Sequence, residues 1–275
     1  MMFSLQTMAR QALPGLAGGL VLAAAASGAG LAQTQPFEPV TEPHTWTLDI
    51  GGGAVYGFSP GGKDPNSVNA TAWGSFNYRD RLYANGLDGV GYNLIKRAGL
   101  RAGVQLRPAY SVESTLDGLD NPDLGADATV YAFTALPGNF VVGGRIARDV
   151  TGVSDGTSLF ASLSRQDVTP VGLLQSTLYG RGGDDARAQA YLGVDAAEAI
   201  ASGIDAYDAD GGLHAVGVAA MLMLPLGDDY GVGGFVNYER ATGSAADSPL
   251  TALSDTGADR YRWGLIVVRR FSSAD

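Results

Sequence analysis

The sequence contains no cysteine, only two histidines, and no long apolar run beyond its N-terminal segment. Without cysteine, a small secreted fold stapled by disulfides is excluded. Two separate histidines and no thiolate also disfavour a transition-metal site. Because a second run of about 18 apolar residues is missing, no helix of the remaining chain can cross a membrane. The net charge of −10 disfavours nucleic acid as a partner and argues against a polybasic grip on anionic lipid.

The chain begins with an export signal. Residues 13–31 are rich in Ala, Gly, Leu and Val, and they end in a small-x-small cleavage pattern. We therefore expect a secretory signal peptide over residues 1–32, cleaved between Ala32 and Gln33. The alternative is a membrane-anchor helix, which the many glycines and the short Leu/Val core disfavour. Residues 33–44 hold three prolines and are expected to form an extended periplasmic lead-in.

After the lead-in, apolar or small residues occupy every second position. Side chains alternate across a β-strand, so residues 45–59 would have one apolar face and one polar face. The apolar parity carries Trp46, Leu48, Ile50, Gly52, Ala54, Tyr56 and Phe58. Similar segments recur, and the 40 glycines suit bulges and close packing in a curved sheet. The predicted strands are 45–59, 69–79, 88–96, 99–112, 126–136, 138–149, 156–167, 171–182, 186–194, 211–225, 228–241 and 259–271.

The connections and aromatic residues favour a barrel in a membrane. Tight turns are predicted at Leu136–Asn139 and Leu226–Asp229, and longer polar stretches lie at 59–68, 113–125, 195–210 and 242–258. Alternating short and long connections are typical of outer-membrane barrels. Aromatic residues near strand ends would form the girdles at the two membrane surfaces: Trp46, Tyr56, Phe58, Tyr78, Tyr238, Tyr261, Trp263 and Phe271.

These patterns predict an all-β fold, a transmembrane antiparallel up-and-down β-barrel over residues 45–271. It would have about twelve strands, within a range of about ten to fourteen. Residues 272–275 would be a short C-terminal tail, and residues 195–201 could form a short helix in a loop. A soluble periplasmic β-sandwich also alternates in this way and remains the alternative.

The polar parity of several strands predicts a charged barrel interior. The residues expected to point inward are Arg101, Gln105, Arg107, Arg145, Glu239, Arg262 and Arg270. One interpretation is a mutually paired polar core that fills a narrow barrel. The other is a small aqueous path, in which the excess of arginine would favour anions. Both interpretations remain open at this stage.

No pattern in the chain predicts catalysis, a metal site or a cofactor. His44 and His214 both flank strands, and no serine near His214 stands in an activated context. Asp208-Ala209-Asp210-Gly211 resembles part of a calcium loop but lacks the downstream glutamate. An acidic loop could hold divalent cations at the lipopolysaccharide surface, although a solvated rim is the simpler interpretation; its residues are Asp117, Asp120, Asp123 and Asp127.

The final third of the chain resembles a known family. The relevant segments are Tyr-Leu-Gly-Val at 191–194, Ala-Ile-Ala-Ser-Gly at 199–203, and Ala-Ala-Asp-Ser-Pro at 245–249. They are similar to the MipA/OmpV family (MltA-interacting protein) of outer-membrane proteins. The residues that carry this resemblance are Tyr191, Gly193, Ser202, Gly203, Ala246, Asp247, Ser248 and Pro249. The resemblance spans about 45–271 and is strongest from residue 190 onward.

The resemblance implies a β-barrel without enzymatic activity in the outer membrane of a Gram-negative bacterium. Its implied role is a scaffold that brings a murein-degrading lytic transglycosylase together with a murein synthase. Some members are described as porin-like, so a channel for small solutes is the alternative. The implied surroundings are outer-membrane lipid and lipopolysaccharide.

Two features depart from the expected pattern. Many outer-membrane barrels end on an aromatic residue that the assembly machinery recognises, whereas Phe271, the candidate assembly signal here, is followed by four more residues. Ser244 stands where the family commonly has aspartate.

Overall fold

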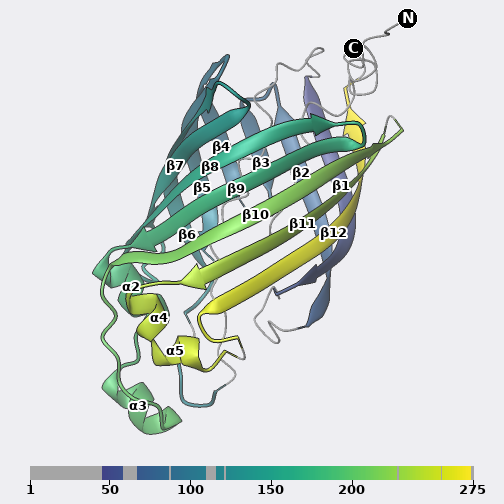
Figure 1. Cartoon of the computed structure of the whole chain (residues 1–275). Coiled ribbons are helices and arrows are strands. Elements are labelled where there is room, and N and C mark those ends of the chain that lie inside the picture. The colour runs from purple at the N-terminus through teal and green to yellow at the C-terminus, as the bar shows by residue number, and fades with distance from the viewer. Residues whose placement is uncertain are drawn as a thin grey trace, which may run out of the picture.

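The protein forms a closed barrel of twelve antiparallel strands (Figure 1). The computed structural model describes residues 45–57, 67–86, 88–109, 116–120, 122–227, 229–254 and 256–273. The strands are β1 (Trp46–Tyr56), β2 (Val68–Tyr78), β3 (Leu82–Asn85), β4 (Gly89–Arg97), β5 (Leu100–Ala109), β6 (Gly125–Leu136), β7 (Phe140–Asp149), β8 (Thr157–Thr169), β9 (Gly172–Gly183), β10 (Gly212–Leu226), β11 (Tyr230–Ala241) and β12 (Asp259–Ser272). The helices are α2 (Asp185–Leu192), α3 (Ala196–Ser202), α4 (Ser244–Asp247) and α5 (Pro249–Ala252).

The barrel closes where the first strand pairs with the last. β1 and β12 run antiparallel over ten residue pairs, from Thr47 beside Ser272 to Tyr56 beside Trp263. A Cβ atom on Gly53 would collide with the main-chain carbonyl oxygen of Leu265, so this close approach requires glycine. The seam therefore depends on residues at both ends of the sequence. Closure leaves no sheet edge at this point and excludes the β-sandwich alternative.

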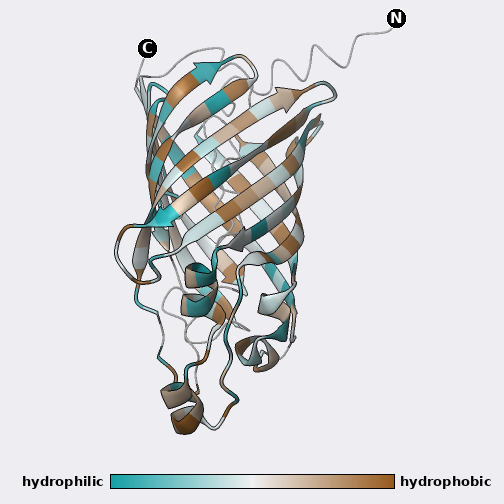
Figure 2. Cartoon of the chain, turned by 90° about the vertical axis from the view of Figure 1, so that its left-hand side faces the viewer, coloured by the Kyte–Doolittle hydropathy of each residue, from teal (hydrophilic) through white to brown (hydrophobic). Residues whose placement is uncertain are grey.

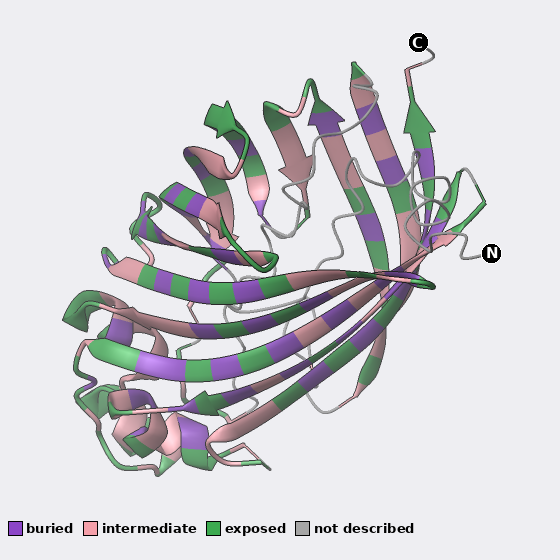
Figure 3. Cartoon of the chain, turned by 45° about the horizontal axis from the view of Figure 1, so that its top comes forward, coloured by how far each residue is buried: buried purple, intermediate pink, exposed green. Residues whose placement is uncertain are grey.

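Alternation separates a lipid-facing outside from a polar inside (Figures 2 and 3). In β12, Trp263 and Leu265 are 43% and 53% exposed, whereas Arg262 and Ile266 are 4% and 2% exposed. Exposed apolar side chains recur on every strand around the barrel, including Leu82 on β3 and Leu178 on β9, and they form a continuous band far larger than a water-soluble protein normally tolerates. Such a band is typical of strands that face lipid.

The two ends of the barrel differ in their connections. Short turns join β2 to β3, β4 to β5, β6 to β7, β8 to β9 and β10 to β11, whereas all four helices lie at the opposite end (Figure 1). Outer-membrane barrels have short periplasmic turns and long extracellular loops, so the helices mark the extracellular end. The tight turns predicted after Leu136 and Leu226 are present. None of the helices in the described part of the chain is long and apolar enough to cross a membrane.

The predicted strand total is confirmed, but one predicted strand is wrong. Most of the segment 186–194 lies in helix α2 (Asp185–Leu192), because Asp184 caps its first turn and alanines at 186, 188 and 190 favour helix. The structure adds β3, whose four residues are too few to show alternation. The other predicted strands match observed ones, and the short helix expected over 195–201 is α3, which begins with an Asp195–Glu198 capping box.

The β3–β4 hairpin is shorter than its neighbours. β3 pairs with β2 only over Ser75–Tyr78 and with β4 only over Gly89–Tyr92. The hairpin therefore folds back part-way up the barrel, and Asp88 at its turn is 1% exposed. This places an acidic side chain among the inward-facing arginines of β5 and β7.

Candidate functional site

Helix α2 begins at the extracellular mouth with a capping aspartate. The Asp184 carboxylate accepts hydrogen bonds from the main-chain N–H of Thr157 at 2.9 Å and of Arg187 at 3.0 Å. Desolvation raises the pKa of this carboxyl, but the two main-chain donors outweigh it and hold the pKa below its ordinary value. The cap therefore joins α2 to the start of β8.

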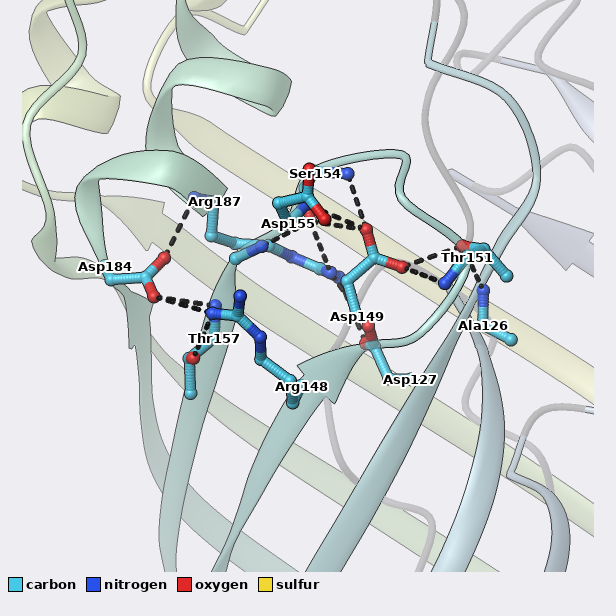
Figure 4. A network of polar contacts seen from close by, with 11 residues as sticks. Ala126, Asp127, Arg148, Asp149, Thr151, Ser154, Asp155, Thr157, Asp184 and Arg187 are labelled. Atoms are coloured by element: carbon cyan, nitrogen blue, oxygen red, sulfur yellow. Dashed lines mark hydrogen bonds and ion pairs between the residues drawn. The ribbon is translucent and has the colours of Figure 1, made fainter.

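The Arg187 side chain joins α2 to the barrel wall through an ion pair with Asp127 (Figure 4). Its guanidinium donates to both carboxylate oxygens of Asp127 on β6, at 2.9 and 3.1 Å. It also lies 4.5 Å from the ring centre of Tyr191, one turn along the helix. The side chain of Asp127 is 4% exposed, so this bidentate ion pair is largely shielded from water.

Asp149, at the end of β7, shapes the loop beside this ion pair. Its carboxylate accepts from the main-chain N–H of Thr151, Ser154 and Asp155, at 2.8, 2.5 and 3.0 Å (Figure 4). The hydroxyl of Ser154 in turn accepts from Arg187 at 3.3 Å. One buried carboxylate thus organises the β7–β8 loop and presents it to α2.

Glu239 is the centre of the polar interior near this end. Its carboxylate accepts from Arg181 at 2.7 and 2.9 Å and from the Tyr179 hydroxyl at 3.1 Å. Arg262 approaches to 3.7 Å. The glutamate is 1% exposed and Arg262 4% exposed, whereas the side chain of Arg181 is 24% exposed, so the carboxylate is shielded while one of its partners reaches water. Gly217, on the strand between Tyr179 and Glu239, leaves the space that the Tyr179 ring occupies.

Two further ion pairs cross the interior. Arg107 lies 3.5 Å from the Asp88 carboxylate, and Gln105 donates to the Asp88 main-chain carbonyl at 2.6 Å. Arg270 donates to both oxygens of Asp49 across the β1–β12 seam, at 2.7 and 2.8 Å. These side chains are nearly all buried.

The remaining arginines expected inside lie on the inner face of the wall. Arg145 is 6% exposed and lies 4.4 Å from the ring centre of Phe160. Arg101 is half-buried on the same face of β5 as Gln105. The acidic partners Asp49, Asp88 and Asp127 were not among the inward residues that the sequence predicts. Their strand parity could have identified Asp49 and Asp127, whereas Asp88 becomes internal only because of the short β3–β4 hairpin.

These groups pair with one another and do not form a catalytic or metal constellation. The His214 Nε2 atom lies 3.3 Å from the main-chain carbonyl oxygen of Asp210. Within the described ranges, no group of three or more His, Cys, Asp or Glu side chains could hold a metal ion. The aspartates of the predicted acidic loop have different partners. Asp127 pairs with Arg187, whereas the main-chain N–H of Asp120 donates to Glu198. The Ala32–Gln33 cleavage site and His44 lie outside the described residues.

The comparison with known families is decisive. The model of the family described as "MltA-interacting protein MipA" matches residues 50–271. The chain belongs to the MipA family. The barrel fold and this membership identify an outer-membrane barrel protein. A search of curated proteins gave no match.

This MipA-family chain is also similar to solved outer-membrane proteins. The COG4313 outer membrane channel from Pseudomonas putida F1 shares 13% identity, with 86% of this chain and 98% of that chain covered and a TM-score of 0.42. A bacterial polysaccharide outer membrane secretin shares 10% identity, with 85% and 100% covered and a TM-score of 0.40. Pseudomonas aeruginosa OccK2 (OpdF) shares 12% identity, with 82% and 97% covered and a TM-score of 0.27.

The residues that resemble the MipA family join the extracellular loops to one another. Ser248 is 1% exposed, and its hydroxyl donates to the main-chain carbonyl of Leu192 at the end of α2, at 2.6 Å. Ser248 also caps α5, in which Pro249 is the first residue. Ala246 and Asp247 lie in α4, directly before this cap. The Ala-Ala-Asp-Ser-Pro segment therefore connects the β11–β12 loop to the β9–β10 loop.

The other family residues end the loop helices. Gly203 follows α3 with φ +78°, a left-handed conformation that favours glycine, and the Ser202 hydroxyl donates to the Glu198 carbonyl at 2.6 Å. Gly193 follows α2, where a Cβ atom would collide with Gln189. The Tyr191 hydroxyl is buried and, within the described part of the chain, has no hydrogen-bond partner.

The two departures from the family pattern also have structural settings. Ser244 lies at the start of α4 and contacts the Tyr207 hydroxyl at 2.9 Å, and its hydroxyl accepts from the main-chain N–H of Asp210 at the same distance. Phe271 is 39% exposed on the outer face of β12, and the Arg269 guanidinium lies 4.9 Å from its ring centre. Beyond it, the main-chain N–H of Ser273 donates to the Trp46 carbonyl at 3.1 Å.

Proposed function

We propose that this barrel is an outer-membrane scaffold that holds a murein-degrading lytic transglycosylase and a murein synthase together at its periplasmic end. The family description supports this proposal, because it names an interaction with MltA, a lytic transglycosylase. The barrel would then act through the surface that it offers to partners and not through a reaction.

The observation that carries the proposal is the burial of the interior carboxylates. Glu239, Asp88 and Asp49 are each 1% exposed, and each lies within ion-pair distance of an arginine. A conducting path would need such charged groups to face water. The interior therefore favours a barrel whose outer surface and turns carry the function over a channel for small solutes.

The periplasmic end suits a docking platform. The short turns there follow directly from hydrogen-bonded strands, so the closed wall fixes their positions relative to one another. Murein and the enzymes that remodel it occupy the periplasm. Helices α2 to α5, which hold most of the residues resembling the family, lie at the opposite, extracellular end (Figure 1). We assign these helices a role in folding and in ordering the extracellular loops.

Co-purification tests this function. A tagged barrel extracted from outer membranes in mild detergent is expected to retain both enzymes. An epitope inserted into the periplasmic turn at Gly138 should reduce their recovery, whereas the same epitope inserted at Gly152 in the extracellular β7–β8 loop should not. Failure of the unmodified barrel to retain either enzyme would refute the scaffold. Discrete conductance in planar bilayers would support the channel instead.

A further inference from the structure

Exposed charge is unevenly divided between the two ends of the barrel. The extracellular end is rich in exposed acidic residues, among them Asp120, Asp195 and Asp208. At the periplasmic end, four exposed cations gather on the β2–β3 turn and the tip of the β4–β5 hairpin. We call this group the basic rim; its residues are Arg79, Arg81, Lys96 and Arg97.

The basic rim has little internal neutralisation. Asp80 is the one acidic residue on these two turns, and it forms an ion pair with Lys96. Among the ion pairs of the described residues, none involves Arg79, Arg81 or Arg97. The rim is therefore a local concentration of positive charge on a chain of net charge −10.

Hydrogen bonds fix the β2–β3 turn against β1 and β4. The main-chain N–H of Arg79 donates to the Thr45 carbonyl at 2.8 Å, and the Asn93 side chain on β4 donates to the Asp80 carbonyl at 2.9 Å. Arg81 Nη1 donates to the main-chain carbonyl of Asn93 at 3.2 Å. The cations therefore project from a folded surface, and less entropy is lost when a ligand binds them.

The basic rim adjoins the lipid-facing band. Tyr78, Tyr92 and Leu94 are 38%, 41% and 59% exposed on the outside of the barrel. The Arg79 guanidinium lies 5.3 Å from the Tyr78 ring centre. Aromatic side chains beside cations are typical of the level at which lipid headgroups meet water. Guanidinium groups at that level are suited to bind phosphate, with two parallel hydrogen bonds.

We propose that the basic rim is a binding site for anionic phospholipid headgroups of the periplasmic leaflet. The site would hold the barrel at a fixed depth and enrich anionic lipid beside the β2–β5 wall. An acidic protein is less well matched, because the cations continue directly into side chains that face lipid. This inference depends on the membrane orientation and not on the scaffold role, so either can fail without the other.

Lipid binding to the reconstituted full barrel tests the site. Phosphatidylglycerol and phosphatidylcholine, each spin-labelled, are compared for their association with the protein in nanodiscs. The unmodified barrel should prefer phosphatidylglycerol. In the double variant Arg79→Gln/Arg97→Gln, the ratio of phosphatidylglycerol to phosphatidylcholine association should fall about tenfold, because each cation near a membrane surface adds to the attraction of anionic lipid. Arg81 is left unchanged because it makes main-chain hydrogen bonds.

A matched control removes the same charge from the same end. Arg165→Gln/Arg269→Gln alters two periplasmic arginines outside the rim, which lie over the rings of Phe140 and Phe271. It should retain most of the preference, and folding of both variants is checked by heat-dependent migration on a gel. Equal losses in the two variants, or no preference in the unmodified barrel, would overturn the proposal. The proposal would also be overturned if Arg79→Gln/Arg97→Gln lost binding to an acidic protein but kept its preference for phosphatidylglycerol.

Discussion

At the scale of single residues, the interior is organised by carboxylates that each serve several donors. Glu239 accepts from Tyr179 and Arg181 on β9 and lies beside a second cation, Arg262 on β12. Asp149 accepts from three main-chain N–H groups of the β7–β8 loop. Asp184 caps the first turn of α2 and accepts from the main-chain N–H of Thr157. In a buried site, a charge is tolerated only when such partners replace its water.

Neutralising Glu239 should therefore destabilise the barrel. In Glu239→Gln, the buried Arg262 and the partly buried Arg181 lose their counter-charge, and we expect a loss of about 3–5 kcal/mol in the free energy of unfolding. Denaturant titration in lipid vesicles, followed by tryptophan fluorescence, measures this. The control is Asp259→Asn, which removes the partner of the exposed Arg240 and should cost less than about 1 kcal/mol. Equal losses would show that Glu239 is not a special centre.

At the scale of elements, local sequence was informative where strand periodicity was long enough. Strands such as β5, β7 and β12 alternate over ten or more residues and are correctly predicted. The segment 186–194 fails because its alternating small and polar residues suit a short helix as well as a strand. Its helical state is decided by the Asp184 cap and by Arg187, whose partner Asp127 is 60 residues away.

Arg187 should keep helix α2 and the rest of the 184–211 loop ordered at the extracellular end. In Arg187→Gln the bidentate ion pair to Asp127 is lost, so α2 should detach from the wall while the barrel stays closed. Limited proteolysis of protein in vesicles is expected to cleave the 184–211 loop several times faster than in the unmodified protein. Arg148→Gln is the matched control, because its contact to Asp184 is longer, at 3.8 Å, and exposed. A stable loop in Arg187→Gln would contradict this role.

At the scale of the whole molecule, closure joins the two ends of the chain. β1 and β12 are separated by most of the sequence, yet they pair along their length and share the Asp49–Arg270 ion pair. The glycines of β1 allow the two backbones to approach. Pairing of the neighbouring strands β2, β3 and β4 brings the two turns of the basic rim together, and the length of the barrel separates the rim from the acidic loops.

Substitution of a seam glycine should hinder closure. In Gly53→Ala the new methyl group meets the Leu265 carbonyl, so β1 or β12 must shift. We expect a reduced yield of the heat-modifiable folded form after refolding into detergent. Gly74→Ala is the control, because a Cβ atom there has no neighbour within 4 Å. Normal refolding of Gly53→Ala would show that the seam is looser than its register implies.

The sequence by itself determined the class of this protein. Side-chain alternation has a period of two, so it specifies which face of each strand meets lipid without knowledge of any partner strand. The inward placement of Gln105, Arg145 and Glu239 follows from that parity. The identity of the family was also present in short segments near the C-terminus.

Only the tertiary structure decided how the charges meet. Net charge is a sum over the chain, and it argued against contact with anionic lipid, whereas folding gathers four cations on one rim with a single acidic residue, Asp80. The partners of Arg187, Arg181 and Arg270 are 60, 58 and 221 residues away. Pairing over such separations depends on strand register and closure, which local sequence patterns do not encode.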